Sequence, residues 1–380
     1  MTSQPSTTTW RRIADWARAR VARGYEPPGT STPTIEFIPR RPRDLSSDSA
    51  NGVRGDGPGN TGAIAIGVLT PTYVARASHA DQSQTIAHVL DQIADIHRAF
   101  PALRLVYFLG MQWSHEAERA EALARLDRAH EATKARDGIE FVGLCLPGPG
   151  KLRTINAVIP VARAAHLTGL LWIDDDIQME LDCLTRLTAR FIDKGGRGAV
   201  GATKIPRTGT TATSSVLRRA KGVSGSAMNF PHGCCMLVET NVLAGGIPDR
   251  YPSDDVYVCF QLLAPHAANP LQHLELVPDA CCRYTSGGAL FPTVGKIRRI
   301  LLNQHVYLAD WPIETARCYF ERVLFTGLWP LASWDGTQGW RVGLAKLMVQ
   351  WLYFLFFLVA GAELVVRGWL RAPLRRIGWN

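Results

Sequence analysis

Short apolar runs alternate with longer amphipathic stretches through the middle of the chain. Four runs have the length and residue types of buried strands, at 63–69, 103–109, 139–144 and 169–173. Segments with a helical spacing of apolar residues separate them, at 81–100, 115–136 and 155–165. Strands that alternate with helices in this order form βαβ units and a mostly parallel sheet. The sequence therefore predicts an α/β fold that binds ligands at the carboxyl ends of its strands.

The pattern continues less regularly after the fourth strand. Further elements are expected as a helix at 182–193, a strand at 197–203, a mobile polar loop at 207–228 and a helix at 256–263. Before the first strand, the segment 24–60 is rich in Pro, Gly, Ser, Thr and Asp, which is typical of a linker. We expect an N-terminal arm and flexible linker at 1–60, a central domain at 61–290 and a C-terminal helical, membrane-associated region at 291–380.

Charge is distributed unevenly along the chain. There are 42 Lys and Arg against 33 Asp and Glu, which gives a formal net charge of +9. Residues 61–290 are neutral, so the excess positive charge lies in the two flanking regions. This distribution argues against a nucleic-acid groove in the central block and favours flanks that meet an anionic surface. The eight cysteines lack paired CxxC motifs, so we expect reduced thiols of a cytoplasmic interior and no zinc site.

Three aspartates, Asp174, Asp175 and Asp176, follow the apolar run 169–173 directly. Side chains alternate along a strand, so Asp174 and Asp176 are expected on one side and Asp175 on the other. Two carboxylates at this spacing suit a hard divalent cation, Mg²⁺ or Mn²⁺, that keeps water and phosphate oxygens as its other ligands. A capped turn is the alternative, because Asp is favoured at helix N-caps and in turns.

A second acidic pair, Asp254 and Asp255, comes directly before the amphipathic segment 256–263. A carboxylate is favoured at a helix N-terminus, so the pair has a structural explanation beside a catalytic one. No glycine-rich stretch fits a nucleotide-binding fingerprint. The first strand is not followed by GxGxxG, and the loop 147–151 lacks the Walker spacing.

Five segments, in order over about 61–305, resemble the family-2 glycosyltransferases, which have the GT-A fold. They are Thr70-Pro71-Thr72-Tyr73, Gly150 to Asn156, Trp172 to Asp176, Gly233 to Val242 with Gly245-Gly246, and Ser253-Asp254-Asp255. The resemblance implies a GT-A catalytic domain at 61–290 with a mostly parallel central sheet. It also implies an inverting, metal-dependent enzyme. Such an enzyme moves a sugar from a nucleotide-diphosphate sugar, here expected to be a UDP-sugar, to a hydroxyl acceptor. A lipid-linked acceptor and a cell-envelope glycan are the candidates.

The resemblance also implies roles for the matching residues. Asp174 and Asp176 would hold the cation, with His305 as a candidate third ligand. Asp255 would be the general base and Asp254 its supporting acid. The acceptor side would be formed by His232 and Gly233, and the nucleotide sugar would be bound by Pro71, Thr72, Tyr73, Lys151, Arg153, Asn156, Asp174 and Arg299. Asn156 has a loop contact as its alternative role, and both histidines have a structural role as theirs.

The chain departs from the family pattern in two places. An acidic residue that contacts the nucleotide base commonly follows the second strand, whereas Leu109-Gly110-Met111-Gln112 contains none. Processive members carry a QxxRW motif, and the nearest match, 296–300, lacks Gln and Trp, which favours transfer of a single sugar. A nucleotidyltransferase is one alternative, although it usually has a glycine-rich basic loop after its first strand. A catalytically silent, membrane-bound protein with the same fold is the other.

The segment 347–362 is almost wholly apolar, and its extension to Val366 gives twenty residues, about 30 Å of helix. Arginines follow it in the sequence. If the helix crossed the membrane from a cytoplasmic domain, these arginines would lie outside the cytoplasm, whereas basic residues are normally kept on the cytoplasmic side. We therefore expect a re-entrant or interfacial helix that holds the protein on the cytoplasmic face of a membrane. The tryptophan-containing segment 296–335 favours surface helices too, with buried helices as the alternative. Residues 10–23 predict a short interfacial helix or a weakly helical arm.

Overall fold

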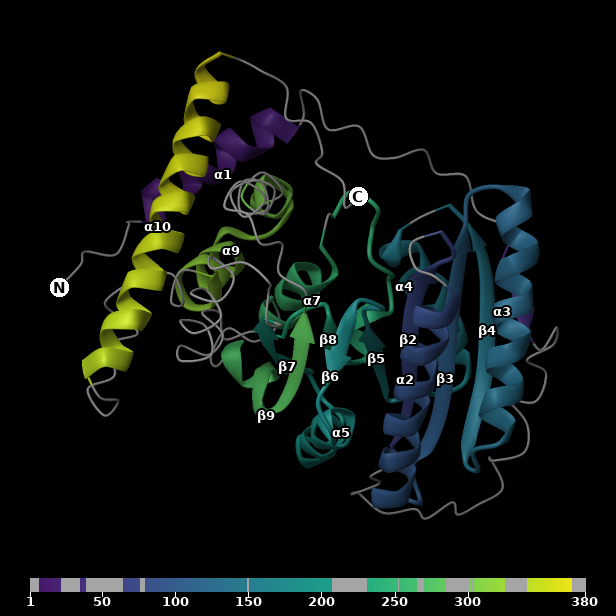
Figure 1. Ribbon diagram of the computed structural model, residues 1–380. Coiled ribbons are helices and arrows are strands. Elements are labelled where there is room, and N and C mark those ends of the chain that lie inside the picture. Colours follow the sequence, from purple (N-terminus) through teal and green to yellow (C-terminus); the bar gives the residue numbers. More distant parts are fainter. Residues whose placement is uncertain are drawn as a thin grey trace, which may run out of the picture.

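The computed structural model describes residues 7–21, 35–38, 64–75, 79–148, 150–206, 231–251, 253–264, 270–284, 301, 304–324 and 340–370. These residues form a mixed sheet of nine strands with helices on both faces (Figure 1). The strand order is β1-β4-β3-β2-β5-β8-β7-β9-β6. The predicted α/β class with a parallel core is confirmed.

The parallel core of the sheet consists of four neighbouring strands. They are β4 (Ile139–Pro147), β3 (Arg104–Trp113), β2 (Ala65–Tyr73) and β5 (Gly169–Ile173). The strands β2, β3 and β4 run three or four residues beyond their predicted ends. Thr70-Pro71-Thr72-Tyr73 is therefore the end of a strand rather than a turn, because it pairs in register with β3 from Leu109 to Gln112.

The rest of the sheet is mixed. Strand β8 (Cys235–Glu239) is antiparallel to β5, and β7 (Ala199–Pro206) is antiparallel to β8. Strand β9 (Leu274–Tyr284) is parallel to β7, and β6 (Ile177–Met179) closes that edge. Neither β9 nor β6 was predicted. At the other edge β1 (Glu36–Ile38) pairs with β4, so the linker prediction is wrong for these three residues.

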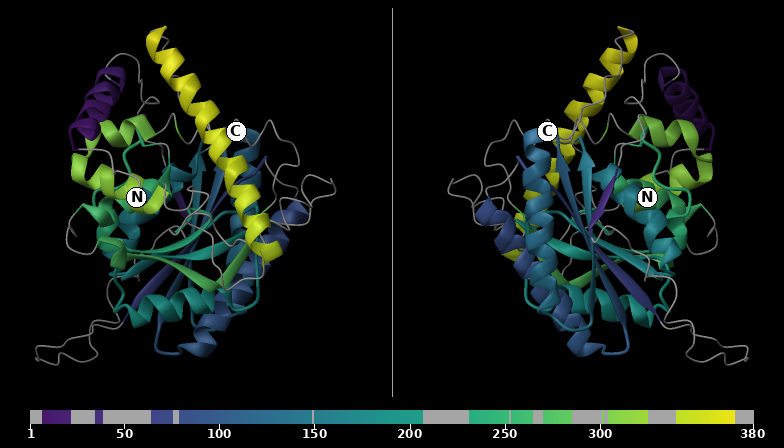
Figure 2. Two further views of the ribbon diagram at one scale, coloured as in Figure 1. Left: turned by 90° about the vertical axis from the view of Figure 1, so that its left-hand side faces the viewer. Right: turned by 90° about the vertical axis from the view of Figure 1, so that its right-hand side faces the viewer.

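Each face of the sheet is covered by its own group of helices (Figure 2). One face carries α2 (His79–Ala99), α3 (Glu116–Lys134) and α5 (Cys183–Asp193). The other carries α4 (Lys151–Ala164) and α7 (Asp254–Leu263). Both faces of the core strands are therefore apolar and buried, which explains why these strands appear in the sequence as continuous apolar runs. Short 3₁₀ helices lie at η2 (Thr240–Leu243) and η3 (Pro270–His273).

Segments from both flanking regions pack onto the second face. The helix α1 (Thr7–Val21) buries Ala14 and Ala17 and lies against α9 (Ile313–Cys318). A π-helical turn, η4 (Tyr319–Leu324), follows α9. The ring of Tyr307 is fully buried and stacks on Phe260 of α7, with 5.0 Å between ring centroids. Of the two alternatives for this segment, the buried one holds for 304–324.

The long helix α10 (Trp340–Trp369) lies at the margin of the molecule, on the side away from α3 (Figure 1). Within the part of the chain that the structure describes, no helix is both long and apolar enough to cross a membrane. The predicted mobile loop at 207–228 and the tryptophans Trp329 and Trp334 lie outside the described residues.

Candidate functional site

The chain reverses its direction of travel across the sheet beside β2. From β2 it moves outward to β3 and β4 and then returns to β5 on the other side of β2. In open α/β sheets, ligands bind outside the carboxyl ends of the strands at such a reversal. Thr72 lies one residue before the end of β2, and Asp174, Asp175 and Asp176 follow β5. The two strand ends are joined directly, because the Thr72 hydroxyl donates to Asp175 Oδ2 at 2.7 Å.

A single lysine connects the segments that meet at this edge. The ammonium of Lys151, in the first turn of α4, lies 2.7 Å from Asp174 Oδ1 and 2.9 Å from Asp254 Oδ2. It also donates to the carbonyl oxygen of Gly233. We call Lys151, Asp174, Gly233, Asp254 and Asp255 the lysine cluster. It brings together residues from four of the five sequence segments singled out above, and the fifth, at the end of β2, contacts the neighbouring Asp175.

The start of α4, and with it Lys151, is held by a glutamine at the end of β3. The buried Gln112 donates to the Gly150 carbonyl at 2.7 Å and to Thr154 Oγ1 at 2.8 Å, and it accepts from the Gly150 amide at 3.1 Å. Gly150 has φ = 143°, a region that L side chains rarely adopt. Gln112 therefore fixes the loop that leads into Lys151.

Gly233 allows the backbone to approach the acidic pair closely. A Cβ atom at this position would lie 2.7 Å and 2.8 Å from the two carboxylate oxygens of Asp254. The Gly233 amide donates to Asp255 Oδ2 at 3.2 Å, while Asp255 Oδ1 accepts from the Val256 amide at 2.8 Å and from the Ser253 hydroxyl. Asp255 therefore organises the start of α7 and the Gly233 peptide together.

The charges of the lysine cluster shift one another. Burial lowers the pKa of Lys151, but the charges of Asp174 and Asp254 outweigh that effect and raise it above its ordinary value. Burial raises the pKa of Asp254 to about 6, against the opposing effect of Lys151. The pKa of Asp255 is lowered despite its burial, because Ser253, His232 and the Gly233 amide stabilise its ionised form. The carboxylates of Asp254 and Asp255 therefore differ, since the pKa of Asp254 is raised and that of Asp255 is lowered.

The carboxylates after β5 have the donor chemistry that a hard cation requires. The side chain of Asp174 is 31% exposed, and Asp176 is exposed. Two carboxylate groups that reach solvent fit Mg²⁺ or Mn²⁺ with water and phosphate oxygens as further ligands. Among the described residues no three His, Cys, Asp or Glu side chains are grouped to hold a metal, so His305 does not complete such a set. His305 is buried beside the ring of Trp16, at 4.8 Å between centroids.

The other predicted residues lie around the lysine cluster in different roles. Both amide atoms of Asn156 bond the backbone of Ile247, at 2.7 and 2.8 Å, so the loop contact is the one observed. The guanidinium of Arg153 lies over Gly148. His232 is buried and interacts electrostatically with Asp255. Pro71 is buried in β2, and the Tyr73 hydroxyl bonds Ser114 Oγ at 2.7 Å. Arg299 lies outside the described residues.

Sequence analysis missed a second lysine beside the site. Lys204, on β7, lies with its ammonium 4.7 Å from the centroid of the Tyr284 ring. Burial opposes its charge, but Cys234, Tyr284 and Asp174 raise the pKa of Lys204 above its ordinary value. Strand β7 was predicted, but nothing in its sequence marks one residue as facing the carboxyl edge of β5. The antiparallel insertion of β8 between β5 and β7 decides that placement.

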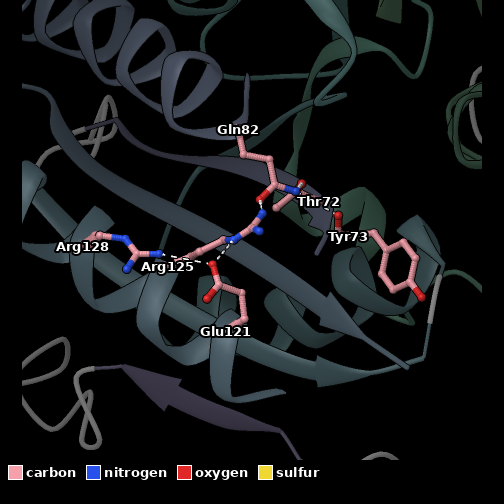
Figure 3. Close-up of polar contacts among 6 residues, drawn as sticks. All are labelled: Thr72, Tyr73, Gln82, Glu121, Arg125 and Arg128. Carbon is pink, nitrogen blue, oxygen red and sulfur yellow. Dashed lines mark hydrogen bonds and ion pairs between the residues drawn. The ribbon is translucent and has the colours of Figure 1, made fainter. Parts of the chain in front are cut away.

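A polar network behind the end of β2 was also missed (Figure 3). Gln82 of α2 donates to Thr72 Oγ1 at 3.2 Å and to the Tyr73 carbonyl at 2.9 Å. The guanidinium of Arg125, on α3, donates to Gln82 Oε1 and pairs with Glu121 at 2.8 Å. We call Thr72, Gln82, Glu121, Arg125 and Arg128 the arginine network. It fixes Thr72. Because the Thr72 hydroxyl donates to Asp175, the network also holds the aspartate turn, which we define as Asp174 to Asp176.

Comparison of the chain with protein-family models and with curated proteins finds no match. The function therefore has to be argued from the site.

Proposed function

We propose that this chain is an inverting glycosyltransferase of the GT-A type that moves one sugar from a nucleotide-diphosphate sugar to a hydroxyl acceptor. The observation that carries the proposal is the lysine cluster, in which one ammonium is shared by Asp174 and Asp254 beside a third carboxylate. This surplus of negative charge lies at the point of the sheet where an α/β fold binds its ligands. A cationic or cation-bound ligand fits that surplus.

The donor diphosphate is proposed to bind between α4 and the end of β5. Lys151 and the N-terminal end of α4, where the helix dipole is positive, supply positive charge and hydrogen bonds to phosphate oxygens. A divalent cation held by Asp174 and Asp176 would supply Lewis-acid stabilisation of the departing diphosphate. Lys204 adds positive charge on the β7 side. Gln112 contributes by keeping the loop before Lys151 in place.

The acceptor hydroxyl is proposed to lose its proton to the acidic pair at the start of α7. Asp255 is ionised at neutral pH because three donors stabilise its carboxylate, and an ionised carboxylate is what a general base needs. Asp254 holds Lys151 against Gly233 and so sets the distance between the donor side and the acceptor side. A single base opposite the leaving group gives direct displacement with inversion.

The experiment is a screen of nucleotide-diphosphate sugars with the purified chain and Mn²⁺ or Mg²⁺. We expect release of the nucleoside diphosphate from one donor class, loss of that release in Asp174→Asn, and retention in Asp279→Asn, which changes an exposed aspartate paired with Arg186. Release of pyrophosphate from nucleoside triphosphates, with no reaction of nucleotide sugars, would instead establish nucleotidyl transfer. Absence of both reactions and of any thermal stabilisation by nucleotides would contradict the proposal.

A further inference from the structure

The helix α10 carries a continuous row of exposed apolar side chains. Each is 45% to 66% exposed, and together they form what we call the α10 stripe: Leu344, Met348, Trp351, Leu355, Leu358, Val359, Val365 and Val366. Successive members are mostly three or four residues apart, which places them on one side of a helix. At about 100° per residue they all lie within roughly 60° of one direction.

The opposite side of α10 attaches the helix to the body. Ala360 is 1% exposed, and Phe357 packs against the core cluster that contains α7 and α9. By the same angular count, both residues lie roughly opposite the α10 stripe. The helix is therefore docked through one side, and its exposed side is as apolar as its buried side. Contiguous exposed apolar surface of this kind marks an interaction site.

The charged residues in and beside α10 favour a lipid surface over a partner helix as the contact of the stripe. Between Lys346 and Glu363 the sequence has no charged residue, and Gln350 is the one side chain with an amide. A partner helix in a coiled coil is normally selected by charged residues that flank the apolar seam, and this helix has none there. Basic residues instead gather towards both ends of the helix and just beyond it: Arg341, Lys346, Arg367, Arg371, Arg375 and Arg376.

The helix α1 also carries exposed basic residues. Its Arg11 and Arg12 are exposed, and α1 and α10 lie on the same side of the molecule (Figures 1 and 2). Glu363 is the one acidic residue from 340 to 380. An apolar stripe on a helix with basic residues near both ends of its sequence matches the surface of a bilayer that contains anionic lipids. There the apolar side chains enter the acyl boundary and the basic ones contact the headgroups.

We propose that the α10 stripe is a docking face for an anionic lipid bilayer, on which α10 lies parallel to the surface. The proposal does not depend on the chemistry of the lysine cluster. It orients the protein so that α10 faces lipid, with the core cluster that contains α7 and α9 behind it. An acceptor located at the membrane would then be presented on this side of the molecule.

The test is co-sedimentation of the full chain with phosphatidylcholine vesicles, with and without about 30 mol% phosphatidylserine. We expect binding to the anionic vesicles only, weakened by high salt because surface charges are screened. The double variant Leu355→Asp, Val359→Asp should bind at least tenfold more weakly. The matched control is the double variant Leu181→Asp, Leu271→Asp, which places the same two charges on exposed leucines outside α10, and it should bind as the wild type does.

Three outcomes would overturn the proposal. The first is no binding to either vesicle, and the second is equal binding by the double variant and the wild type. The third is self-association in lipid-free solution that the double variant abolishes while neither protein binds vesicles, because the stripe would then contact a second copy. Turnover of nucleotide sugars in lipid-free solution should be unchanged in the double variant. Vesicle binding therefore tests the docking face, and turnover in lipid-free solution tests the proposed glycosyltransferase activity separately.

Discussion

The lysine cluster and the arginine network lie at the same edge of the sheet but are built differently. In the arginine network, Arg125 is matched by Glu121, and Gln82 supplies both a donor and an acceptor between Arg125 and Thr72. In the lysine cluster, Lys151 faces Asp174 and Asp254, and Asp255 adds a third carboxylate. The first set contains one more positive than negative charge, whereas the second contains two more negative than positive charges.

This difference separates a supporting network from a candidate site. Buried or half-buried polar groups that serve structure have their partners within the protein. A set of carboxylates that exceeds its internal cations gains stability from an external cation, and the pKa of about 6 for Asp254 reflects that crowding together with burial. Substitutions in the two sets should therefore affect different properties, namely activity in the lysine cluster and stability in the arginine network.

The largest effect is expected from Asp255→Asn. Loss of the proton acceptor should reduce kcat by about 10³-fold, within the range for general-base catalysis. The single amide oxygen can keep the two bonds that Asp255 Oδ1 accepts, from the Ser253 hydroxyl and the Val256 amide, but an NH2 group then faces the Gly233 amide. Tm should therefore fall by only a few degrees, as expected for one lost hydrogen bond. Steady-state kinetics and thermal unfolding check both parts. Unaltered sugar transfer by this variant would refute the role of Asp255 as base.

Lys151→Met should lower kcat/KM by about 10² to 10³-fold, because it removes the positive charge proposed to contact the departing diphosphate. It should also raise the affinity for a divalent cation in the absence of nucleotide, since Asp174 loses its internal partner. Lys134→Met is the matched control, because Lys134 is 57% exposed and pairs with Glu131 on the surface of α3. Equal kinetics for the two variants would show that the positive charge of Lys151 has no role in catalysis.

Gly233→Ala should lower kcat/KM by about 10 to 10²-fold through displacement of Asp254, since the added Cβ would lie 2.7 Å from its carboxylate. Gly245→Ala is the control, because no atom lies within 4 Å of the corresponding Cβ position. If both glycine variants keep full activity, the close approach at Gly233 has no catalytic importance.

The pH dependence of activity and of stability should report on Asp254, because its pKa is raised whereas that of Asp255 is lowered. The ionised form of Asp254 holds Lys151, so kcat/KM should fall up to about tenfold per pH unit below pH 6. Folding raises this pKa from 3.8, so the folded state binds more protons between about pH 4 and 6. The Asp254 contribution to stability therefore decreases as the pH rises through this window. The Tm of the wild type relative to that of Asp254→Asn should decline accordingly, and a flat difference would contradict the assignment.

The smallest effect on activity is expected in the arginine network. Arg125→Ala removes the donor to Gln82 Oε1 and one of the partners of Glu121, and it should lower the free energy of unfolding by about 1–3 kcal/mol, with activity within a few-fold of the wild type. Arg128→Ala is the control, because Arg128 is 52% exposed and should change stability by less than about 0.5 kcal/mol. Denaturant unfolding measures both. A large loss of activity without loss of stability in Arg125→Ala would make the two regions alike.

Site residues could be predicted from the sequence where a charged side chain stands directly beside a recognisable strand or helix. Lys151, Asp174 and Asp254 could be predicted to lie together because each follows or precedes a recognisable apolar element. Their mutual contacts could not be predicted, because the Lys151 to Asp254 distance depends on how α7 packs on the sheet. Gln82, Arg125 and Lys204 gave no signal, since a polar residue on an amphipathic helix or in a strand appears the same whether it faces solvent or a strand end. The edge strand β1 was missed because three residues between polar segments are too short for a periodic pattern.

The proposed glycosyltransferase requires that Asp174 and Asp176 bind a nucleoside diphosphate through a divalent cation. The most direct test of this requirement is equilibrium binding of nucleoside diphosphates by calorimetry, with and without Mn²⁺, to the wild type, Asp174→Asn and the control Asp279→Asn. We predict that Mn²⁺ tightens binding at least tenfold in the wild type and in Asp279→Asn but not in Asp174→Asn. Failure of every nucleoside diphosphate to bind, or an equal effect of Mn²⁺ on all three proteins, would contradict the account.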